Sequence, residues 1–262
     1  MSFFENTRKP TGFGGKLMVL MMNVGHRALS GWGLRFLKIA PDAKVLDCGC
    51  GGGANIRALL KKCPKGIVKG IDYSAVSAEQ ARKRNADAIQ AGRCAVWQGS
   101  VEQIIFASGW FDAVTAFETV YFWPGLVPCF REVYRVLKPD GTFLICNECG
   151  GDIPGDEKWT QRISGMRIYK DTQLKAALEE AGFRDVQIYK HKRDWLCVLA
   201  RNTGKVLTHN YILKEVWGSA LASDTPSLRV FMATLRKKIE KDPSAPRYIQ
   251  THIGVGYRMI RQ

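Results

Sequence analysis

The sequence predicts an α/β protein with an open sheet, followed by a small basic unit of helices and a hairpin. Two observations predict the first part: apolar runs of strand length alternate with helical patterns, and the first of these runs ends in a glycine-rich turn. A third observation predicts the second part, because beyond about residue 200 two amphipathic helical patterns precede a hairpin pattern. The 262 residues suffice for one full domain and one small domain.

The glycine-rich turn lies in Lys44–Asn55, which reads KVLDCGCGGGAN. A short apolar run ends in Asp47, the glycines Gly49 and Gly51 follow, and a helical pattern begins near Ala54. Glycines are needed where a turn adopts positive φ or where the backbone lies close against a ligand. In open α/β sheets such a turn borders the usual ligand crevice.

Two classes of ligand use a turn of this kind. The spacing Gly49-x-Gly51-x-x-Ala54 fits the dinucleotide fingerprint, and Asp72 follows at about the right distance. Asp47 argues against a dinucleotide, because its carboxylate would face and repel a pyrophosphate. It suits a ligand that has a cationic amine and no phosphate, such as S-adenosylmethionine.

The next predicted strand, 66–71, ends in Asp72. A carboxylate at this position can accept hydrogen bonds from both hydroxyls of a ribose. The alternative is that Asp72 caps the following helix, predicted over 75–91. A third strand over 94–98 leads into the turn at Ser100 and Val101.

The later elements follow in the same alternation. The aromatic-rich loop 117–124 comes directly after a buried strand, at the sheet edge where a substrate should lie. The remaining predicted elements are strand 111–116, helix 127–137, strand 142–147, helix 171–181 and two closing antiparallel strands, 186–190 and 195–199.

The N-terminal part is expected to be an arm followed by helices. Residues 1–15 are polar and glycine-containing, which favours a flexible arm, and 16–37 favours two short helices broken near Gly25 or Gly31–Gly33. His26 lies in this region. It is either a polar residue on a helix packed at the sheet edge or part of a lid over the ligand.

The net charge and the cysteine content indicate the kind of partner and the cellular compartment. The net charge is +15, and the last 66 residues carry +7 of it, which favours a polyanion such as nucleic acid as a partner of the tail, or else a solvated basic surface. The eight cysteines do not form a disulfide framework pattern, and Cys146-x-x-Cys149 lacks a second pair. We therefore expect a cytoplasmic protein without a metal site. The apolar run Leu17–Asn23 is too short to span a bilayer, so no membrane partner is expected.

Four separated segments resemble the class I S-adenosylmethionine-dependent methyltransferases: VLDCGCGGGANI, GIDYS, FDAVTAFETVYFWP and EVYRVLKPDGTFLI. The resemblance covers roughly residues 40–200 and implies a Rossmann-like seven-stranded sheet whose last strand is antiparallel. The resemblance also implies cofactor contacts. These are Asp47, Gly49 and Gly51 at the methionine end, Asp72 and Tyr73 at the ribose, Ser100 and Val101 at the adenine, and Phe117 with Glu118 near the sulfonium.

Methyl transfer from a sulfonium needs positioning more than covalent help from the protein. A base is required only if the acceptor carries a proton of high pKa. The candidates are Glu118, His26 and Tyr121, with Glu148 beside them. The expected acceptor is a small molecule. Methylation of DNA is disfavoured, because residues 116–119 read AFET and lack the Asp/Asn-Pro-Pro-aromatic loop typical of amino-group DNA methylation.

The tail predicts a helix over 210–217, a second helix over 227–240, and a hairpin from 247–252 and 257–260. This order, with a basic second helix, is typical of a helix-turn-helix with a wing.

The segments ARNTGKVLTHNYILKEVWG, LRVFMATLRKKIEKDP and RYIQTHIGVGYRM resemble the output domain of OmpR/PhoB-type response regulators of the KdpE kind. The resemblance implies that Ser227–Lys238 enters the major groove of double-stranded DNA. It implies base contacts by Arg229 and Thr234, phosphate contacts by Arg236 and Lys237, and a wing contact by Arg258.

The tail departs from that family in one respect. The family's domain has about another forty residues before this point, including a first helix, and 194–201 stands where that helix should be. The same segment also serves as the last strand of the methyltransferase sheet, and one segment cannot be both at once. We therefore expect three parts: an arm with lid helices (1–39), a cofactor-binding domain (40–199) and a partial winged helix-turn-helix (200–262).

Two functions follow from these parts. The first is methyl transfer to a small molecule, with an appended DNA-binding module. The alternative is a DNA-binding transcriptional regulator whose methyltransferase-like domain senses the cofactor or is inert.

Overall fold

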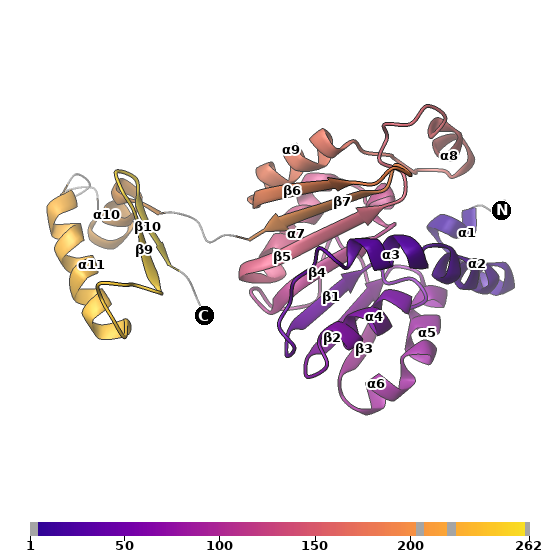
Figure 1. The fold of residues 1–262 in the computed structure, drawn as a ribbon, viewed down its shortest axis with the longest axis horizontal. Coiled ribbons are helices and arrows are strands. Elements are labelled where there is room, and N and C mark those ends of the chain that lie inside the picture. Colours follow the sequence, from indigo (N-terminus) through magenta and orange to yellow (C-terminus); the bar gives the residue numbers. More distant parts are fainter. Residues whose placement is uncertain (1–4, 203–206, 219–223, 260–262) are drawn as a thin grey trace. The chain divides into compact units, whose positions relative to one another are not determined.

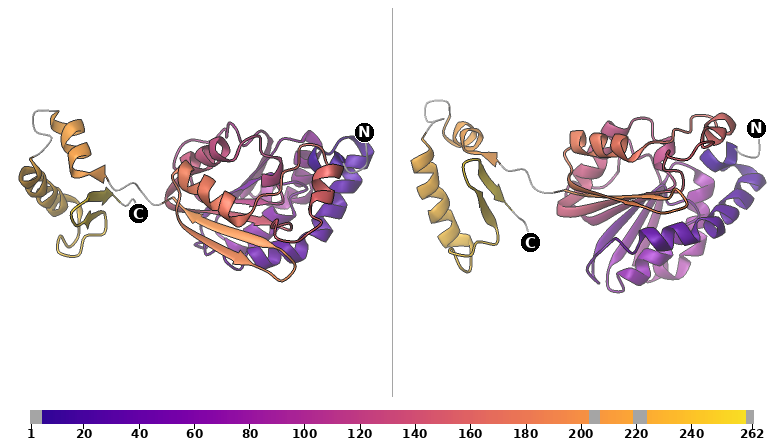
Figure 2. Two further views of the ribbon diagram at one scale, coloured as in Figure 1. Left: turned by 90° about the horizontal axis from the view of Figure 1, so that it is seen from above. Right: turned by 45° about the horizontal axis from the view of Figure 1, so that its top comes forward.

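The computed structural model describes residues 5–202, 207–218 and 224–259, in two compact units, Met1–Asn202 and Thr203–Gln262. The first unit holds a seven-stranded sheet of order β3-β2-β1-β4-β5-β7-β6, with helices on both of its faces (Figures 1 and 2). Its strands are β1 (Lys44–Cys48), β2 (Ile67–Asp72), β3 (Cys94–Gln98), β4 (Phe111–Phe117), β5 (Leu137–Asn147), β6 (Arg184–Lys190) and β7 (Leu196–Arg201). The predicted Rossmann-like sheet is confirmed.

The helices of the first unit alternate with the strands after the N-terminal segment. They are α1 (Glu5–Arg8), α2 (Gly12–Gly25), α3 (Arg27–Gly33), α4 (Ala54–Lys62), α5 (Ala75–Arg84), α6 (Ala86–Gln90), η1 (Val120–Phe122), α7 (Leu126–Val136), α8 (Glu157–Arg162) and α9 (Asp171–Ala181).

Two apolar cores cover the two faces of the sheet. On one face Phe130 of α7, Phe143 of β5 and Phe183 pack together, and on the other Leu59 of α4 packs with residues of α3 and β1. The inner strands are buried on both sides, as a parallel sheet under helices requires. The ends of β1, β2 and β4 therefore meet on a rigid frame, which positions the site.

The segment 194–201 could have formed either the last strand of the sheet or the first helix of the tail, and its residues 196–201 form strand β7. It pairs antiparallel with β5 from Thr142↔Arg201 to Asn147↔Leu196, and it also pairs antiparallel with β6. A short apolar run is compatible with a buried helix or a buried strand, so its neighbours decide. Here five consecutive residues, Leu196–Ala200, are buried between two strands. Within the folded first unit, they do not provide a first helix for the tail.

The N-terminal segment differs from the predicted arm. Glu5–Arg8 is helical and α2 begins at Gly12, because side chains fasten the segment: Thr11 N donates to Asn6 Oδ1 at 3.0 Å, and Ser74 Oγ donates to Pro10 O at 2.8 Å. Residues 1–4 of the arm lie outside the described residues. The predicted break near Gly25 is confirmed, since α2 ends there.

Two other boundaries differ from prediction. The helix predicted over 75–91 is divided at Asn85 into α5 and α6, and α8 forms in a segment expected to be a loop. Among the described residues no helix is long and apolar enough to cross a membrane. All eight cysteines are unpaired thiols.

The second unit holds two helices and a three-stranded sheet of order β8-β10-β9. Its elements are β8 (Leu207–Thr208), α10 (His209–Trp217), α11 (Thr225–Ile239), β9 (Ile249–His252) and β10 (Gly256–Met259). Asp224 caps α11 by accepting from Ser227 N at 3.2 Å. Ile260, the end of the predicted hairpin, lies outside the described residues. The predicted helix, helix and hairpin are confirmed.

Candidate functional site

The turn between β1 and α4 is a glycine loop in a left-handed conformation. The φ angles are 71° at Gly49, 50° at Gly51 and 74° at Gly53. A Cβ on Gly49 would overlap the Thr119 side chain, whereas one on Gly51 would meet no atom within 4 Å. The loop therefore needs glycine at Gly49 for closeness to its neighbour, and it leaves open space beside Gly51.

Asn85, which sequence reasoning missed, fastens this loop. Its Nδ2 donates to Gly53 O at 3.1 Å and to Ala81 O at 2.9 Å, and the side chain is buried. The only sequence signal is a polar residue inside an amphipathic helical pattern. Its partner lies 32 residues away, so the pattern does not reveal the contact.

Asp72 supports the loop from the end of β2. Its Oδ2 accepts from Gly51 N at 2.8 Å, and its Oδ1 accepts from Ser74 N at 2.9 Å. Ser74, and not Asp72, caps α5, because Ser74 Oγ accepts from Ser77 N. Burial raises the pKa of Asp72 to about 6, although these two hydrogen bonds lower it. Each carboxylate oxygen keeps a second lone pair for a ligand.

Asp47, near the end of β1, is more deeply buried than Asp72. Thr115 Oγ1 donates to its Oδ1 at 2.7 Å, while Oδ2 is buried with no hydrogen-bond partner in the described structure. Burial raises the pKa of Asp47 to about 7, the Thr115 hydrogen bond lowers it, and the nearby Asp72 charge raises it further. A buried carboxylate oxygen without a partner is a costly arrangement that a donor on a ligand would relieve.

One cavity of about 980 Å³ connects these elements. It lies at the top of the range for ligand pockets, which is enough for a cofactor and a second molecule. Of the predicted site residues its wall includes Gly49, Gly51, Asp72, Tyr73, Phe117, Glu118, Tyr121 and His26. Helix α2 and the segment around α8 complete the wall, through residues such as Met22, Trp159 and Met166.

Three predicted cofactor contacts do not line this cavity. Asp47 lies behind the loop, and Val101 packs into the core. The hydroxyl of Ser100 pairs with Glu102, accepting from its N at 3.2 Å. Burial of Val101 follows from its apolar side chain, which the core beside β4 takes up.

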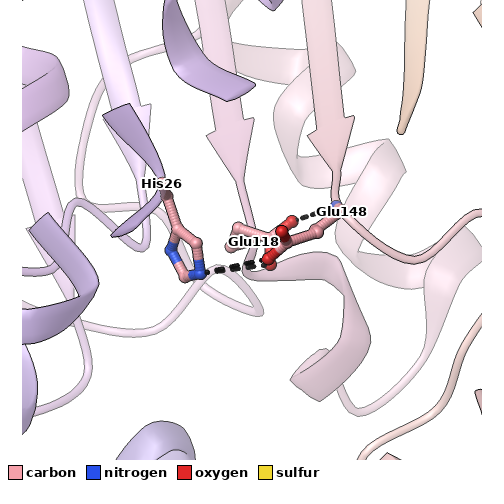
Figure 3. Close-up of side chains that lie close together, drawn as sticks. All are labelled: His26, Glu118 and Glu148. Atoms are coloured by element: carbon pink, nitrogen blue, oxygen red, sulfur yellow. Dashed lines mark hydrogen bonds and ion pairs between the residues drawn. The ribbon is translucent and has the colours of Figure 1, made fainter. Parts of the chain in front are cut away.

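In the wall of the same cavity His26, Glu118 and Glu148 lie side by side (Figure 3). His26 Nε2 is 3.8 Å from Glu118 Oε2 and 3.6 Å from Glu148 Oε2. Glu118 Oε1 accepts from Glu148 N and from the Tyr121 hydroxyl, the latter at 3.4 Å. The predicted catalytic residues thus come from two parts distant in sequence: His26 from the junction of α2 and α3, and Glu118 and Tyr121 from the segment that follows β4 and includes η1.

The electrostatics of this cluster follow from burial. Burial raises the pKa of Glu118 to about 8, and the Glu148 charge adds to the rise despite the hydrogen bond from Glu148 N. Burial lowers the pKa of His26, although Glu148 opposes the shift. Glu118 also has φ 59°, a conformation that costs a non-glycine residue about 1–3 kcal/mol and that is common at functional sites.

Part of the N-terminal arm, for which the sequence favoured flexibility, borders the cavity through Thr7, Arg8 and Pro10. The Tyr73 hydroxyl donates to Arg8 O, and Arg8 Nη1 donates to Ser164 O at 3.2 Å. These contacts connect α1, the end of β2 and the segment after α8. Short polar residues near a terminus give no sequence signal for such a role.

In the second unit the predicted DNA contacts divide into two groups. Arg229, Thr234 and Lys237 are exposed on α11, although Thr234 Oγ1 donates to Val230 O within the helix. Arg236 differs from the expected phosphate contact, because its guanidinium donates to Ile249 O at 2.6 and 3.1 Å.

A further hydrogen bond from Arg236 reaches Thr251 Oγ1 at 2.7 Å, and its guanidinium lies 5.7 Å from the Tyr257 ring. Arg236 therefore joins α11 to the hairpin. Arg258 on β10 is partly buried.

These two units match two families. Residues 46–145 match the methyltransferase domain family, and residues 184–259 match the family described as transcriptional regulatory protein, C terminal. The fold is that of a Rossmann-like class I methyltransferase. The chain joins a methyltransferase domain to a regulator C-terminal domain of the OmpR/PhoB type.

Each of the two matched segments also has similar proteins. The transcriptional regulatory protein KdpE of Mycobacterium tuberculosis is 36% identical over 104 residues, 39% of this chain and 40% of that protein. Cycloartenol-C-24-methyltransferase 1 of Oryza sativa is 33% identical over 113 residues, 43% of this chain and 33% of that enzyme. The chain thus spans 40% or less of the length of these two relatives.

Among solved structures, a SAM-dependent methyltransferase from Aquifex aeolicus superposes with a TM-score of 0.60 at 18% identity. It covers 72% of this chain and 98% of that one. At this identity the likeness shows the fold alone.

The regulator match begins at residue 184, inside the methyltransferase sheet. Residues 184–201 form β6 and β7 here, so the part of the chain that matches the start of the regulator domain is folded into the other unit. The second unit keeps only α10, α11 and the three short strands among its described residues. It is a partial winged helix.

The cofactor of the methyltransferase class is S-adenosylmethionine, and the residues present fit it. The open space beside Gly51 admits a ligand against the backbone, and the unpartnered Asp47 Oδ2 lies behind the same loop. The negative charge of Asp47, buried behind the loop, disfavours the pyrophosphate of a dinucleotide.

Proposed function

We propose that the first unit transfers a methyl group from S-adenosylmethionine to a small molecule. The observation that supports this most is the single cavity that joins the glycine loop and Asp72 to the cluster of His26, Glu118 and Tyr121. When bound, the cofactor supplies an activated methyl group on a sulfonium. The protein's task is to position both partners and exclude water.

We assign each cofactor contact from the position of the residue relative to the glycine loop and the cavity. Asp72 accepts from the ribose hydroxyls with the lone pairs that Gly51 and Ser74 leave unused. The glycine loop admits the methionine end, toward which Asp47 contributes negative charge from behind. Tyr73 and Phe117 border the same space. Ser100 and Val101, outside the cavity wall, remain proposed adenine neighbours.

The catalytic assignment is Glu118, His26 and Tyr121. Tyr121 accepts from Cys149 N at 2.8 Å, which fixes its hydroxyl beside Glu118. His26 is held between α2 and α3 and directs Nε2 at both carboxylates. These groups orient an acceptor and take its proton when it carries one.

The test uses the purified chain. We expect calorimetry to show binding of S-adenosylmethionine, and a metabolite extract to cause release of S-adenosylhomocysteine. Gly49→Val should lose both, because its side chain would overlap Thr119 and occupy a left-handed φ. Wild-type protein that binds no S-adenosylmethionine would contradict the proposal.

We further propose that the second unit binds double-stranded DNA through α11. The supporting observation is that Arg229, Thr234 and Lys237 are exposed along one helix of a unit that matches a regulator family. Arg229 and Thr234 would face base edges, Lys237 a phosphate, and Arg258 the wing side. Arg236 serves this interface by fixing α11 against β9.

The DNA prediction is tested with Arg229→Ala plus Lys237→Ala. We expect affinity for duplex DNA to fall at least tenfold and the slope of log affinity against log salt to become shallower, because each phosphate contact adds about one to that slope. Lys175→Ala plus Lys192→Ala, which removes equal charge from the first unit, should change neither. Affinity of the double variant equal to wild type would exclude α11 as the interface.

A regulator that senses the cofactor is the second candidate. Under it, S-adenosylhomocysteine would alter DNA affinity without any acceptor being methylated. We place the protein in a reducing cytoplasm, in keeping with its eight unpaired thiols.

A further inference from the structure

Two carboxylates in the cavity wall pair with no lysine or arginine in the part of the chain that the structure describes. Glu118 and Glu148 form ion pairs only with His26 there, whereas several acids elsewhere pair with lysine or arginine. Such pairs are Glu79 with Lys83, Glu132 with Arg135 and Asp112 with Lys138. The cluster therefore concentrates negative charge at one end of the cavity.

The arginines of the cavity do not neutralise this charge. Arg8 is bonded to Ser164 O, and Arg193 lies over the Trp195 ring at 5.5 Å. In the described structure neither they nor Arg27 form an ion pair with Glu118 or Glu148. Glu118 is largely shielded from solvent, whereas half of the Glu148 side chain is exposed. Two carboxylates held this close repel each other, and a cation between them relieves the repulsion.

The surroundings suit an organic cation. Aromatic rings of Tyr121 and Phe122 border the cavity near the cluster, and further along its wall are Met22, Ile163 and Met166. Aromatic faces attract ammonium groups, and apolar side chains bury a hydrocarbon body. His26, Glu118 and Glu148 could also hold a metal ion, because one ligand atom from each lies within 4.8 Å of the others, so the experiment distinguishes a metal ion from an organic cation.

We propose that the methyl acceptor is an amine with an apolar body, bound as its ammonium between Glu118 and Glu148. This inference rests on the proposed methyltransferase function. His26 Nε2, at 3.6 and 3.8 Å from the two carboxylates, completes the site. The apolar body extends along the wall formed by α2, η1 and the segment after α8.

The reaction balances without a further reactant. The bound ammonium favours the ionised form of Glu118, whose carboxylate, made more basic by burial, then takes one proton from it. The freed nitrogen lone pair forms the N–C bond to the methyl group. The C–S bond breaks with its electrons remaining on sulfur, so S-adenosylhomocysteine and a methylated ammonium leave.

The experiment compares amines with alcohols of equal length. Calorimetry is performed on the full chain saturated with S-adenosylhomocysteine, using n-butylamine, n-hexylamine and n-octylamine against the matching alcohols. We expect n-octylamine to bind at least about tenfold tighter than n-octanol, since a charge-assisted contact is gained. Affinity should rise along the amine series.

Two isosteric variants locate the effect. Glu148→Gln and Glu118→Gln should each remove most of the amine preference, and in Glu148→Gln S-adenosylhomocysteine binding should stay near wild type. Glu180→Gln, an exposed acid that pairs with Arg131, should retain the preference. Mass spectrometry after addition of S-adenosylmethionine should detect N-methyl-octylamine from the wild type.

Three results would overturn the inference. Equal affinity for amine and alcohol, with S-adenosylhomocysteine bound, would overturn this inference but not the proposed methyltransferase function. Tight Mn²⁺ binding seen by electron paramagnetic resonance, lost in Glu148→Gln, would show that the cluster is a metal site instead. Absence of S-adenosylhomocysteine binding would overturn the proposed function and this inference together.

Discussion

Asp72→Ala is expected to abolish calorimetrically measurable binding of S-adenosylmethionine. Asp72 is proposed to accept from two ribose hydroxyls, and each hydrogen bond to a charged group is worth about 1.5–3 kcal/mol. Their loss corresponds to at least about 100-fold in affinity. The variant also frees Gly51 N and Ser74 N, so the loop that admits the cofactor loosens at the same time.

Two controls separate these effects. Asp72→Asn keeps acceptor capacity toward Gly51 but loses the charge, so we expect it to retain weak binding. Asp87→Ala, an exposed acid on α6, should bind like wild type. If Asp72→Ala bound the cofactor with wild-type affinity, Asp72 would not be the ribose acceptor.

Asp47→Asn is expected to stabilise the ligand-free protein at pH 8 while weakening cofactor binding. Burial raises the pKa of Asp47 to about 7 in the folded state, against an ordinary value of 3.8. The folded state thus binds a proton more tightly than the unfolded state, and stability falls as pH rises from about 4 to about 7. Above that range wild type carries the full penalty, and the neutral amide removes it.

The size of this effect follows from the shift. A change of about three pKa units corresponds to about 4 kcal/mol, from which an unsatisfied amide group takes back about 1–3 kcal/mol. We expect a net gain of about 1–3 kcal/mol in the free energy of unfolding, measured in urea at pH 8. At pH 4 the gain should be lost and Asp47→Asn should be no more stable than wild type, because Asp47 is then protonated in the folded state and only the cost of the amide remains. Equal stabilities at pH 8 would contradict a buried charge at Asp47.

The cofactor half of the site could be read from the sequence because it is local. Strand, glycine turn and helix follow within Lys44–Lys62, and Asp72 ends the next strand, so parallel-sheet topology alone brings them together. Asn85 could not be read, because it acts on Gly53 through a helix break that propensity does not predict.

The acceptor half depends on contacts between distant segments. His26, Glu118 and Glu148 were separate candidates, and only the packing of α3 against β5, with α2 packed on α3, makes them one cluster. Arg236 looked like a phosphate contact from its place on a basic helix. Its guanidinium instead donates to the carbonyl oxygen of Ile249, 13 residues away.

By itself the sequence determined both kinds of unit, because strand-length apolar runs, glycines and helical periodicity are local properties of the chain. Only the tertiary structure decided whether residues 196–201 form a strand or a helix. This apolar run suits a strand or a helix, and the seven-stranded sheet buries it between β5 and β6, where both edges of its backbone find hydrogen bonds. Pairing with distant strands, and not the run's own preference, is why the second unit remains a partial winged helix.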